Sequence, residues 1–323
     1  MLCPFCETLA RRFGRNRNGS QRYQCLACGR TFTDEATRPE DGRRLPFDQA
    51  IFCLRLLLEG TSIRSVERLT GIHRDTILSA FVDAGERCQR FLEETIRDVP
   101  VKDVQADEIW AFIGCKEKTR ERNNYAEYFG DAYCFTAIER STKVIIAWHL
   151  GKRSAEDTWL FAEKLYRATN GRFQLTTDGF TPYRTAIPFT FGHRVDFAQL
   201  VKVYGYPDGD ERRYSPPQVV EAVAIPRTGS PDESRICTSH VERSNLTIRM
   251  TVRRLTRLTN AFSKKWDNHE AALALFFAYY NFCRPRQTLT EEMGYRCAPA
   301  MRAGLTDHVW TVAELLRITV GME

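Results

Sequence analysis

The 323-residue chain is predicted to be a multidomain α/β protein in which two small modules precede a larger domain built on a β-sheet. Three observations predict this organisation. Residues 1–36 contain two C-x-x-C pairs, residues 47–98 carry only helical patterns, and from residue 99 onward apolar strand patterns alternate with helical ones. A chain of this length has room for two or three domains.

The composition is that of an ordinary globular protein with a mild excess of positive charge. Hydrophobic residues make up 43% and charged residues 27%, and the formal net charge is +6. This charge permits nucleic-acid binding without requiring it. We expect a cytoplasmic protein with no membrane partner, because no run of 18 apolar residues occurs and the start lacks signal-peptide features. Seven scattered cysteines are expected to be reduced core residues: Cys53, Cys88, Cys115, Cys134, Cys237, Cys283 and Cys297.

The first module, residues 1–36, is predicted to be a zinc ribbon. Cys3 and Cys6 form one C-x-x-C turn, and Cys25 and Cys28 form the second, with 18 residues between the pairs. This spacing is typical of a site in which four thiolates hold one structural Zn²⁺. Redox chemistry is the alternative for a single C-x-x-C, but two pairs at this spacing disfavour it. The arginines of the ribbon suit DNA or an acidic protein surface equally.

Residues 37–46 are interpreted as a linker, and residues 47–98 as a helix-turn-helix domain. Helices are predicted over residues 47–60, 62–71 and 73–94, with a glycine closing each of the first two. The start of the third helix would enter the major groove of DNA. Its candidate base-reading residues are His73, Arg74, Thr76 and Ser79. The alternative is a plain three-helix packing unit, with His73 as a capping or surface residue.

The catalytic-domain candidate spans residues 99–283 and begins with a strand over residues 104–115. This strand is apolar on both faces, so Asp107 needs a partner, a proton or a metal ion. Glu108 points to the other face and is the weaker candidate. A polar turn, a hairpin over residues 128–139 and 143–151, a helix over 154–171 and a strand over 173–180 follow. Asp178 lies at the end of that last strand.

The remaining segments are predicted as follows. Residues 181–191 form a short helix or turn, and residues 194–205 form another strand. Residues 207–237 are a proline-rich insertion with a hairpin over 219–226. An apolar helix over 269–282 closes the domain. The C-terminal tail, residues 284–323, ends in a helix over 311–320 that would serve as a cap or an oligomerisation element.

The segment Thr238–Asn260 is the most informative stretch of the chain. Ile248, Val252 and Leu255 have helical spacing, and Arg249, Arg253 and Arg257 line another face. Ser239 is predicted to cap this helix, and Glu242 falls in its first turn. The functional interpretation is a metal-binding acid beside a row of arginines that contacts phosphates. The alternative is a solvated cationic surface helix.

Asp107, Asp178 and Glu242 together are predicted to be catalytic metal ligands. Three carboxylates from separate elements can hold two Mg²⁺ or Mn²⁺ ions about 4 Å apart, as phosphodiester chemistry requires. DNA phosphates would then run along the neighbouring polar residues, which are His240, Arg243, Asn245, Arg249, Arg253 and Arg254. Rival acids, which we rank as surface or turn residues, are Asp103, Asp131, Asp157 and Asp196.

These motifs resemble those of transposases of the first-named bacterial insertion-sequence family. The resemblance rests on CPFC with QRYQCLACGRTF, on ADEIWAFIGCKEK, on TTDGF and above all on HVERSNLTIRMTVRRLTRLTNAFSK. It implies a ribonuclease H-like core with a mixed sheet and Asp107, Asp178 and Glu242 as catalytic triad. It further implies N-terminal modules that bind terminal inverted repeats in double-stranded DNA, metal-dependent nicking, and strand transfer without a covalent enzyme intermediate. The chain departs from the family prototype, whose DNA-binding and catalytic parts are joined by frameshifting, because here they are continuous.

Two alternatives remain open beside a transposase. One is a non-catalytic DNA-binding regulator, disfavoured because a pure binder gains nothing from three acids. The other is a nuclease that cuts without joining. A transposase would be a nucleoid-associated homo-oligomer, since two DNA ends must be held together.

Overall fold

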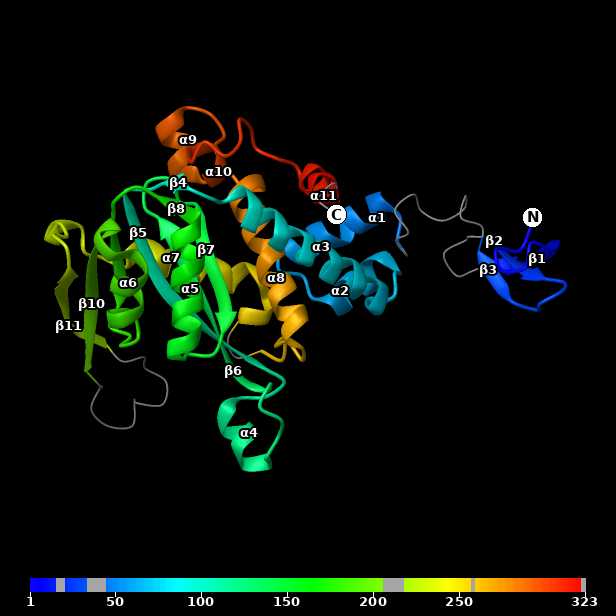
Figure 1. Ribbon diagram of the computed structural model, residues 1–323, viewed down its shortest axis with the longest axis horizontal. Coiled ribbons are helices and arrows are strands. Elements are labelled where there is room, and N and C mark those ends of the chain that lie inside the picture. The colour runs from blue at the N-terminus through cyan, green and yellow to red at the C-terminus, as the bar shows by residue number, and fades with distance from the viewer. Residues whose placement is uncertain (16–20, 34–44, 206–217, 257–258, 321–323) are drawn as a thin grey trace. The chain divides into compact units, whose positions relative to one another are not determined.

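The computed structural model describes residues 1–15, 21–33, 45–205, 218–256 and 259–320 (Figure 1). These residues separate into two compact units. The first comprises Met1–Leu57 and Thr61–Asp83, and the second comprises Leu58–Gly60 and Ala84–Glu323. No helix among the described residues is long and apolar enough to cross a membrane.

The N-terminal part of the first unit is a small antiparallel sheet. Its strands are β1 (Ala10–Arg15), β2 (Gln21–Cys25) and β3 (Thr31–Thr33), in the order β1-β2-β3. The rings of Tyr23 and Phe32 stack between β2 and β3 with centroids 5.9 Å apart. These two rings supply the little apolar packing expected of so short a module. The predicted linker at residues 37–46 lies almost entirely outside the described residues.

The predicted succession of helix, short helix, glycine turn and long helix is confirmed. The helices are α1 (Phe47–Leu58), α2 (Ile63–Thr70) and α3 (Arg74–Thr95). Ser62 caps α2 by accepting a hydrogen bond from the Ser65 amide at 3.1 Å. Gly71 ends α2 with φ of 70°, a conformation that favours glycine. The helices of the first unit enclose a core of Leu45, Ala50, Cys53, Val66 and Ile77.

The second unit is built on a six-stranded mixed sheet with the order β11-β10-β9-β5-β6-β7. Its strands are β5 (Asp103–Ile113), β6 (Gly130–Glu139), β7 (Ile145–Gly151), β9 (Phe173–Asp178), β10 (Val195–Gly205) and β11 (Gln218–Thr228). β5, β9 and β10 are parallel neighbours, and the other pairings are antiparallel. A second, two-stranded ladder joins β4 (Val99–Pro100) to β8 (Thr169–Asn170).

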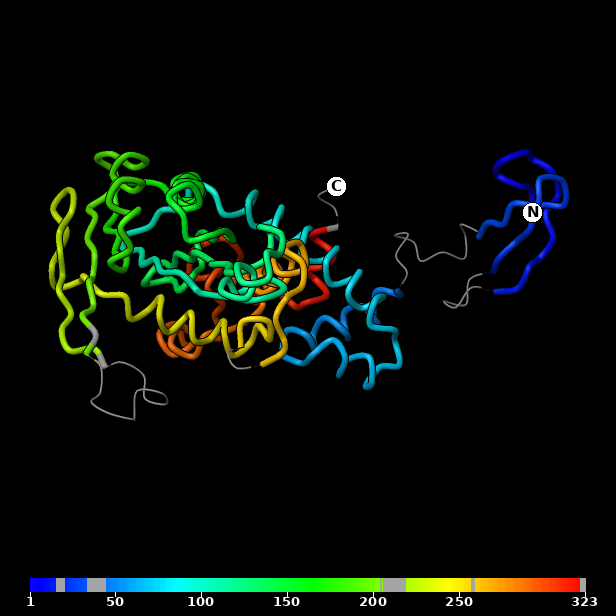
Figure 2. The backbone as a smooth tube through the Cα atoms, turned by 90° about the horizontal axis from the view of Figure 1, so that it is seen from below, coloured from blue at the N-terminus to red at the C-terminus, as the bar shows by residue number. Residues whose placement is uncertain are grey.

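Helices cover both faces of this sheet. On one face lie α5 (Ala155–Ala168) and α6 (Tyr183–Phe191), and on the other lies α7 (Ser239–Thr251) (Figures 1 and 2). Ser154 caps α5, as predicted. The apolar helix α8 (Trp266–Ala278) continues as a π-helical turn over Tyr279–Cys283. Short 3₁₀ turns at Gly192–Arg194 and Glu233–Arg235 lead into β10 and toward α7, and the tail contains α9 (Gln287–Met293), α10 (Pro299–Arg302) and α11 (Val312–Val320).

Two predicted elements differ from the structure. The polar turn after β5 contains a helix, α4 (Glu117–Asn123), because Glu117 pairs with Arg120 at 2.6 Å and accepts the Asp131 amide at 2.9 Å. The hairpin predicted within residues 219–226 is instead formed by β11 with β10. Residues 206–217 of the predicted insertion lie outside the described residues.

The basic helix predicted over Thr238–Asn260 is shorter than expected. It ends at Thr251, and a 3₁₀ turn over Arg253–Leu255 follows. Val252 adopts an extended conformation, which lets Val252 and Leu255 both turn inward and become buried. Consecutive β-branched residues at Thr251 and Val252 favour such an exit from the helix. Arg257 lies outside the described residues.

Candidate metal centre

Asp107 and Asp178 lie side by side on neighbouring parallel strands. The register of β5 and β9 pairs Ala106 with Thr177, and the two aspartates are the next residue on each strand. Carboxylate oxygens of Asp107, Glu108 and Asp178 all lie within 4.8 Å of one another. Such a group of oxygen donors could hold a metal ion.

Asp107 is fixed by two hydrogen bonds. Its Oδ1 accepts the Glu108 amide at 2.9 Å, and its Oδ2 accepts Nδ2 of Asn245 on α7 at 2.8 Å. Burial raises the pKa of Asp107 to about 6, and the charges of Asp178 and Glu242 add to this effect. The carboxylate is therefore oriented, but costly to ionise without a cation.

Glu108 joins the cluster although the sequence ranked it as the weaker candidate. Its side chain is only 3% exposed, and its Oε2 accepts Nε of Arg153 at 3.2 Å. Burial, followed by the charge of Asp178, raises the pKa of Glu108 to about 8, while the Tyr183 hydroxyl opposes the shift. The sequence signal for Glu108 was an acid within a strand that is apolar on both faces. No such signal marks Arg153, because it lies in the segment after β7 and not in an apolar strand.

Asp178 ends β9 beside the same arginine. Its Oδ1 accepts the Phe180 amide at 3.0 Å, and its Oδ2 lies 3.6 Å from Nη2 of Arg153. Burial is the largest cause raising the pKa of Asp178, whereas Arg153 and Lys202 lower it. The guanidinium of Arg153 also stacks 4.2 Å from the Phe180 ring centroid, which fixes its position.

Glu242 lies in the first turn of α7, as predicted, at the rim of the acidic cluster. It is 43% exposed and forms an ion pair with Lys202 of β10, and Thr238 donates a hydrogen bond to it. Within the part of the chain that the structure describes, Glu242 falls outside the 4.8 Å group. Its charge nevertheless contributes to the raised pKa values of Asp107 and Asp178.

The predicted DNA-facing residues near Glu242 divide into exposed and buried ones. Arg243 and Arg253 are exposed, although Arg253 lies in the 3₁₀ turn and not on the helix. Asn245 was expected to face the DNA, but it is buried and donates a hydrogen bond to Asp107. Arg249 is half-buried. Arg254 turns inward to donate to Ser263 at 2.9 Å, and burial lowers its pKa to about 10.

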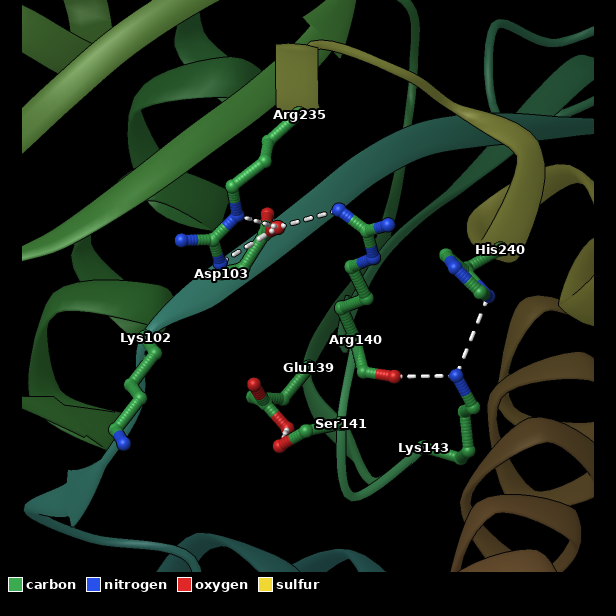
Figure 3. A pocket seen from close by; sticks show the side chains of 8 residues that line it. All are labelled: Lys102, Asp103, Glu139, Arg140, Ser141, Lys143, Arg235 and His240. Atoms are coloured by element: carbon green, nitrogen blue, oxygen red, sulfur yellow. Dashed lines mark hydrogen bonds and ion pairs between the residues drawn. The ribbon is translucent and has the colours of Figure 1, made fainter. Parts of the chain in front are cut away.

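His240 lies at the start of α7, away from the acidic cluster. Its Nδ1 is 3.3 Å from Nζ of Lys143, in a pocket lined by basic side chains (Figure 3). Burial lowers the pKa of His240, and the charges of Lys143 and Arg140 act in the same direction.

The predicted base-reading residues lie at the start of α3 and in its first two turns. Arg74 and Ser79 are exposed, and His73 and Thr76 are half-buried. Nδ1 of His73 accepts the Asp75 amide at 3.3 Å, so His73 caps the helix. This capping role was the alternative interpretation of His73.

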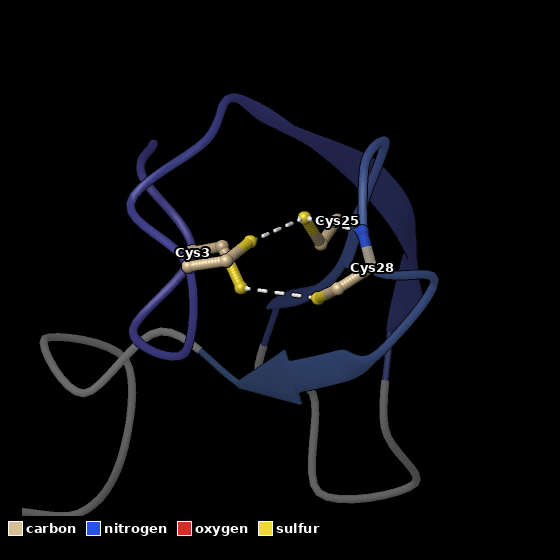
Figure 4. A group of neighbouring side chains, drawn as sticks. Cys3, Cys25 and Cys28 are labelled. Atoms are coloured by element: carbon tan, nitrogen blue, oxygen red, sulfur yellow. Dashed lines mark hydrogen bonds between the residues drawn. The ribbon is translucent and has the colours of Figure 1, made fainter.

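The four ribbon cysteines converge as their spacing predicts (Figure 4). Sγ of Cys3 lies 3.7 Å from Sγ of Cys28, and Sγ of Cys6 lies 3.4 Å from Sγ of Cys25. A tetrahedral ion with metal–sulfur bonds of about 2.3 Å separates its sulfur ligands by about 3.8 Å. The four thiols therefore fit a tetrahedral metal site.

The rival acids are engaged elsewhere. Asp196 pairs with Arg172 at 2.6 Å, Asp157 contacts His149 at 2.9 Å, and Asp131 accepts the Glu117 amide at 3.2 Å. Asp103 was ranked as a surface or turn acid, which is wrong, because its side chain is 2% exposed. Arg140 and Arg235 both form ion pairs with its Oδ2.

No protein-family model and no curated protein matches the chain. Among solved structures, the chain is similar to a piggyBac transposase seen by cryo-electron microscopy in a synaptic complex with hairpin DNA. The sequence identity is 11%, the match covers 84% of this chain and 70% of that chain, and the TM-score is 0.37. A likeness at this level leaves the chemistry to be argued from the side chains.

Proposed function

We propose that the chain is a DNA transposase that binds terminal inverted repeats and catalyses two-metal phosphodiester hydrolysis and strand transfer. The carrying observation is that Asp107 and Asp178 lie side by side on parallel strands with carboxylate oxygens within 4.8 Å, while Glu242, on α7 and outside that group, adds its charge to their raised pKa values. The order β5, β6, β7, α5, β9 in the second unit, with the short helix α4 inserted after β5, supports a ribonuclease H-like core. Together with the sequence motifs, this supports membership of the first-named bacterial insertion-sequence family.

The residues of the cluster fit Mg²⁺ or Mn²⁺. All candidate ligands are carboxylate oxygens, which these ions prefer to nitrogen or sulfur. Burial and mutual repulsion raise the pKa values of Asp107 and Asp178, so a cation would be the natural counter-charge. Two bound ions would activate the attacking oxygen and stabilise the leaving one.

The protein side chains have separate roles in this proposal. Asp107 and Asp178 form the floor of the centre, and Glu242 closes it from α7. Asn245 orients Asp107 through its 2.8 Å hydrogen bond. Glu108, whose pKa is about 8, keeps its proton at neutral pH until a cation lowers that value. Glu108 is thus a fourth candidate metal ligand beside the three predicted ones.

DNA binding is assigned to the first unit and to the exposed arginines beside Glu242. The Cys3, Cys6, Cys25 and Cys28 thiols would hold one structural Zn²⁺ that the ribbon needs in order to fold. Arg74 and Ser79 are the exposed candidates for base contacts, and Arg243 and Arg253 are the exposed candidates for phosphates. A homo-oligomer on two paired DNA ends, within the bacterial nucleoid, follows from this function.

The test is single-turnover cleavage of DNA that carries the element's own ends, with Mg²⁺ or Mn²⁺. The wild type is compared with Asp107→Ala, Asp178→Ala, Glu242→Ala and Glu108→Ala, and Asp131→Ala serves as an acidic control outside the cluster. Wild-type cutting, with DNA binding but no cutting by the first three variants, supports the triad. Normal cutting by Glu242→Ala with none by Glu108→Ala would transfer the third ligand role to Glu108.

A wild type that binds these ends but cuts with neither metal would favour the non-catalytic regulator. A wild type that cuts but never joins the freed 3′-hydroxyl to target DNA would favour a nuclease. These outcomes separate the proposed function from its two alternatives.

A further inference from the structure

A basic pocket of about 470 Å³ opens at the start of α7, on the face of the sheet that α7 covers (Figure 3). The cations that line it come from three separate segments. Lys102 precedes β5, Arg140 and Lys143 belong to the turn between β6 and β7, and Arg235 precedes α7 together with His240. None of these four cations was a predicted DNA contact.

The two arginines are held in place by a buried acid. Oδ2 of Asp103 accepts Nη1 of Arg140 at 3.1 Å and Nε and Nη2 of Arg235 at 3.2 and 3.0 Å. Each guanidinium has five N–H donors, so most of them remain for another acceptor. Guanidiniums fixed in this way lose little side-chain entropy when they bind an oxyanion.

The pocket has an excess of positive charge. It is lined by four cationic side chains and by the two carboxylates of Asp103 and Glu139. Oε2 of Glu139 accepts the Thr142 amide at 2.6 Å and the Ser141 hydroxyl at 2.8 Å. Oδ2 of Asp103 and Oε2 of Glu139 are therefore occupied by internal partners, whereas Oδ1 of Asp103 is buried without a hydrogen-bond partner among the described residues. The side chains that line the pocket carry a net excess of two positive charges. A small anion with several oxygens would satisfy it.

The donors of this pocket are side chains and not the helix terminus. Oε1 of Gln105 already accepts the amides of His240 and Val241 at 2.9 and 3.2 Å. The charges of Lys143 and Arg140 also contribute to the lowered pKa of His240, in keeping with a positive potential here. Arginine and lysine side chains around one opening are the chemistry that recognises a phosphate group.

The pocket and the metal centre lie along the same β-strand, β5. Asp103 and Asp107 are four residues apart on β5, which corresponds to about 14 Å at about 3.4 Å per residue. Both residues lie on the face of β5 that α7 covers. A DNA strand has a phosphate every 3.4 Å of helix axis. The separation of the two sites therefore corresponds to a few nucleotides of one DNA strand.

We propose that the pocket formed by Lys102, Arg140, Lys143, Arg235 and His240 binds a backbone phosphate of the DNA strand a few nucleotides from the one that is cut. The identity of the ligand as a DNA strand rests on the proposed function. The binding of a phosphate by these basic side chains does not depend on the metal-binding acids. The pocket fixes where along the strand the scissile phosphate meets the metal centre.

The test uses the full-length protein and two double variants. Lys102→Gln with Lys143→Gln removes two pocket charges and leaves the Asp103 bridges intact. Lys118→Gln with Arg296→Gln removes two charges from exposed positions elsewhere. Equilibrium binding to duplex DNA is measured over a range of salt concentrations without added divalent metal. Thermal stabilisation by inorganic phosphate, against chloride at equal ionic strength, is measured in parallel.

The pocket variant is expected to bind DNA several-fold more weakly, with a log–log salt slope smaller by about 0.9 for each phosphate that the protein no longer neutralises. Phosphate is expected to stabilise the wild type and the control variant more than the pocket variant. If the pocket variant folds poorly, Lys143→Gln alone gives the same comparison with half the charge removed. A salt slope equal to that of the control variant overturns the proposal.

Stabilisation of the wild type by phosphate combined with unchanged DNA slopes would assign the pocket to a free phosphate and overturn the strand assignment. Failure of the proposed function looks different: the wild type would not cut DNA, while the slopes would still differ between the two double variants.

Discussion

Nδ2 of Asn245 donates a 2.8 Å hydrogen bond to Oδ2 of Asp107, while Oδ1 of Asn245 accepts the Thr136 hydroxyl at 3.2 Å. Thr136 lies opposite Asp107 on β6. The amide of Asn245 is therefore oriented from one side by the sheet, and it orients the carboxylate on the other. This bond favours the ionised form and holds down a pKa that burial raises.

Replacing Asn245 by alanine should weaken divalent-metal binding by about 10–100-fold, the usual effect of removing a residue that orients a metal ligand. The pKa of Asp107 should rise, so the pH profile of metal binding should move to higher pH. Mn²⁺ titration of the wild type, Asn245→Ala and Thr247→Ala, a control on the same helix, measures both effects. Equal affinities and profiles for Asn245→Ala and wild type would show that the bond is incidental.

The order of secondary structure could be predicted because hydrophobic periodicity is a local signal. The buried strand around Asp107 and the strand ending at Asp178 are examples. Element ends were less predictable, since they depend on contacts distant in sequence. Helix α7 stops at Thr251 so that Val252 and Leu255 can be buried, and α4 forms because Glu117 meets Asp131 across the hairpin.

Site residues could be predicted where the pattern within a single strand marked them. They could not be predicted where they reach the site only through the pairing of strands that are distant in sequence. Asp107 was conspicuous as an acid in an apolar strand. Arg153 and Lys202 reach the acids only through the sheet order and the β9–β10 register, which no local pattern reveals. Glu108 was assigned to the opposite face by alternation, yet its longer side chain brings its carboxylate within 4.8 Å of the aspartates.

Stability without metal should fall as the pH rises. The pKa of Asp107 is about 6 in the folded protein against an ordinary 3.8, and that of Glu108 is about 8 against 4.5. The folded state therefore holds these protons more tightly than the unfolded state, so stability decreases between about pH 4 and pH 8. Mg²⁺ should offset the loss, and the stabilisation it gives should be larger at pH 8 than at pH 5.

Melting temperatures with and without Mg²⁺ across that range test this linkage. In Asp107→Asn, the metal-free protein at pH 8 should melt about 2–4 °C higher, which corresponds to roughly 1 kcal/mol for a domain of this size. The Mg²⁺ effect should shrink in the same variant. An Mg²⁺ effect that is independent of pH in the wild type would contradict the assignment.

Removing the charge of Lys202 should strengthen metal binding. The ion pair of Lys202 with Glu242 has to open before Glu242 can serve a metal ion. Exposed ion pairs are worth about 0.2–1 kcal/mol, so Lys202→Gln should raise Mg²⁺ affinity by about 1.5–5-fold. Calorimetric titration measures this, with Lys118→Gln as a control for net charge. Weaker binding by Lys202→Gln would mean that the lysine helps to organise the centre.

Chelation of zinc should unfold residues 1–36 and leave the second unit intact. Four thiols around one tetrahedral ion supply much of the folding free energy in so small a module. Hydrogen exchange with and without chelator should show loss of protection in β1, β2 and β3 only, and Cys25→Ser should reproduce it. Equal loss of protection in β5 and β9 would show that the two parts do not fold independently.

The substitution Gly85→Ala tests how closely α3 packs on α8. A helical Gly→Ala change normally stabilises by about 1 kcal/mol. Here a Cβ at Gly85 would meet the Ala271 carbonyl oxygen at 2.3 Å and the Ala271 Cβ at 2.5 Å. Both contacts are closer than atoms can pack, and overpacking costs about 1–3 kcal/mol. Gly85→Ala should therefore lower the urea midpoint, whereas Glu86→Ala, at the exposed next position, should change stability by less than about 0.5 kcal/mol. If Gly85→Ala is stabilising, the two helices are not packed as closely as this contact requires.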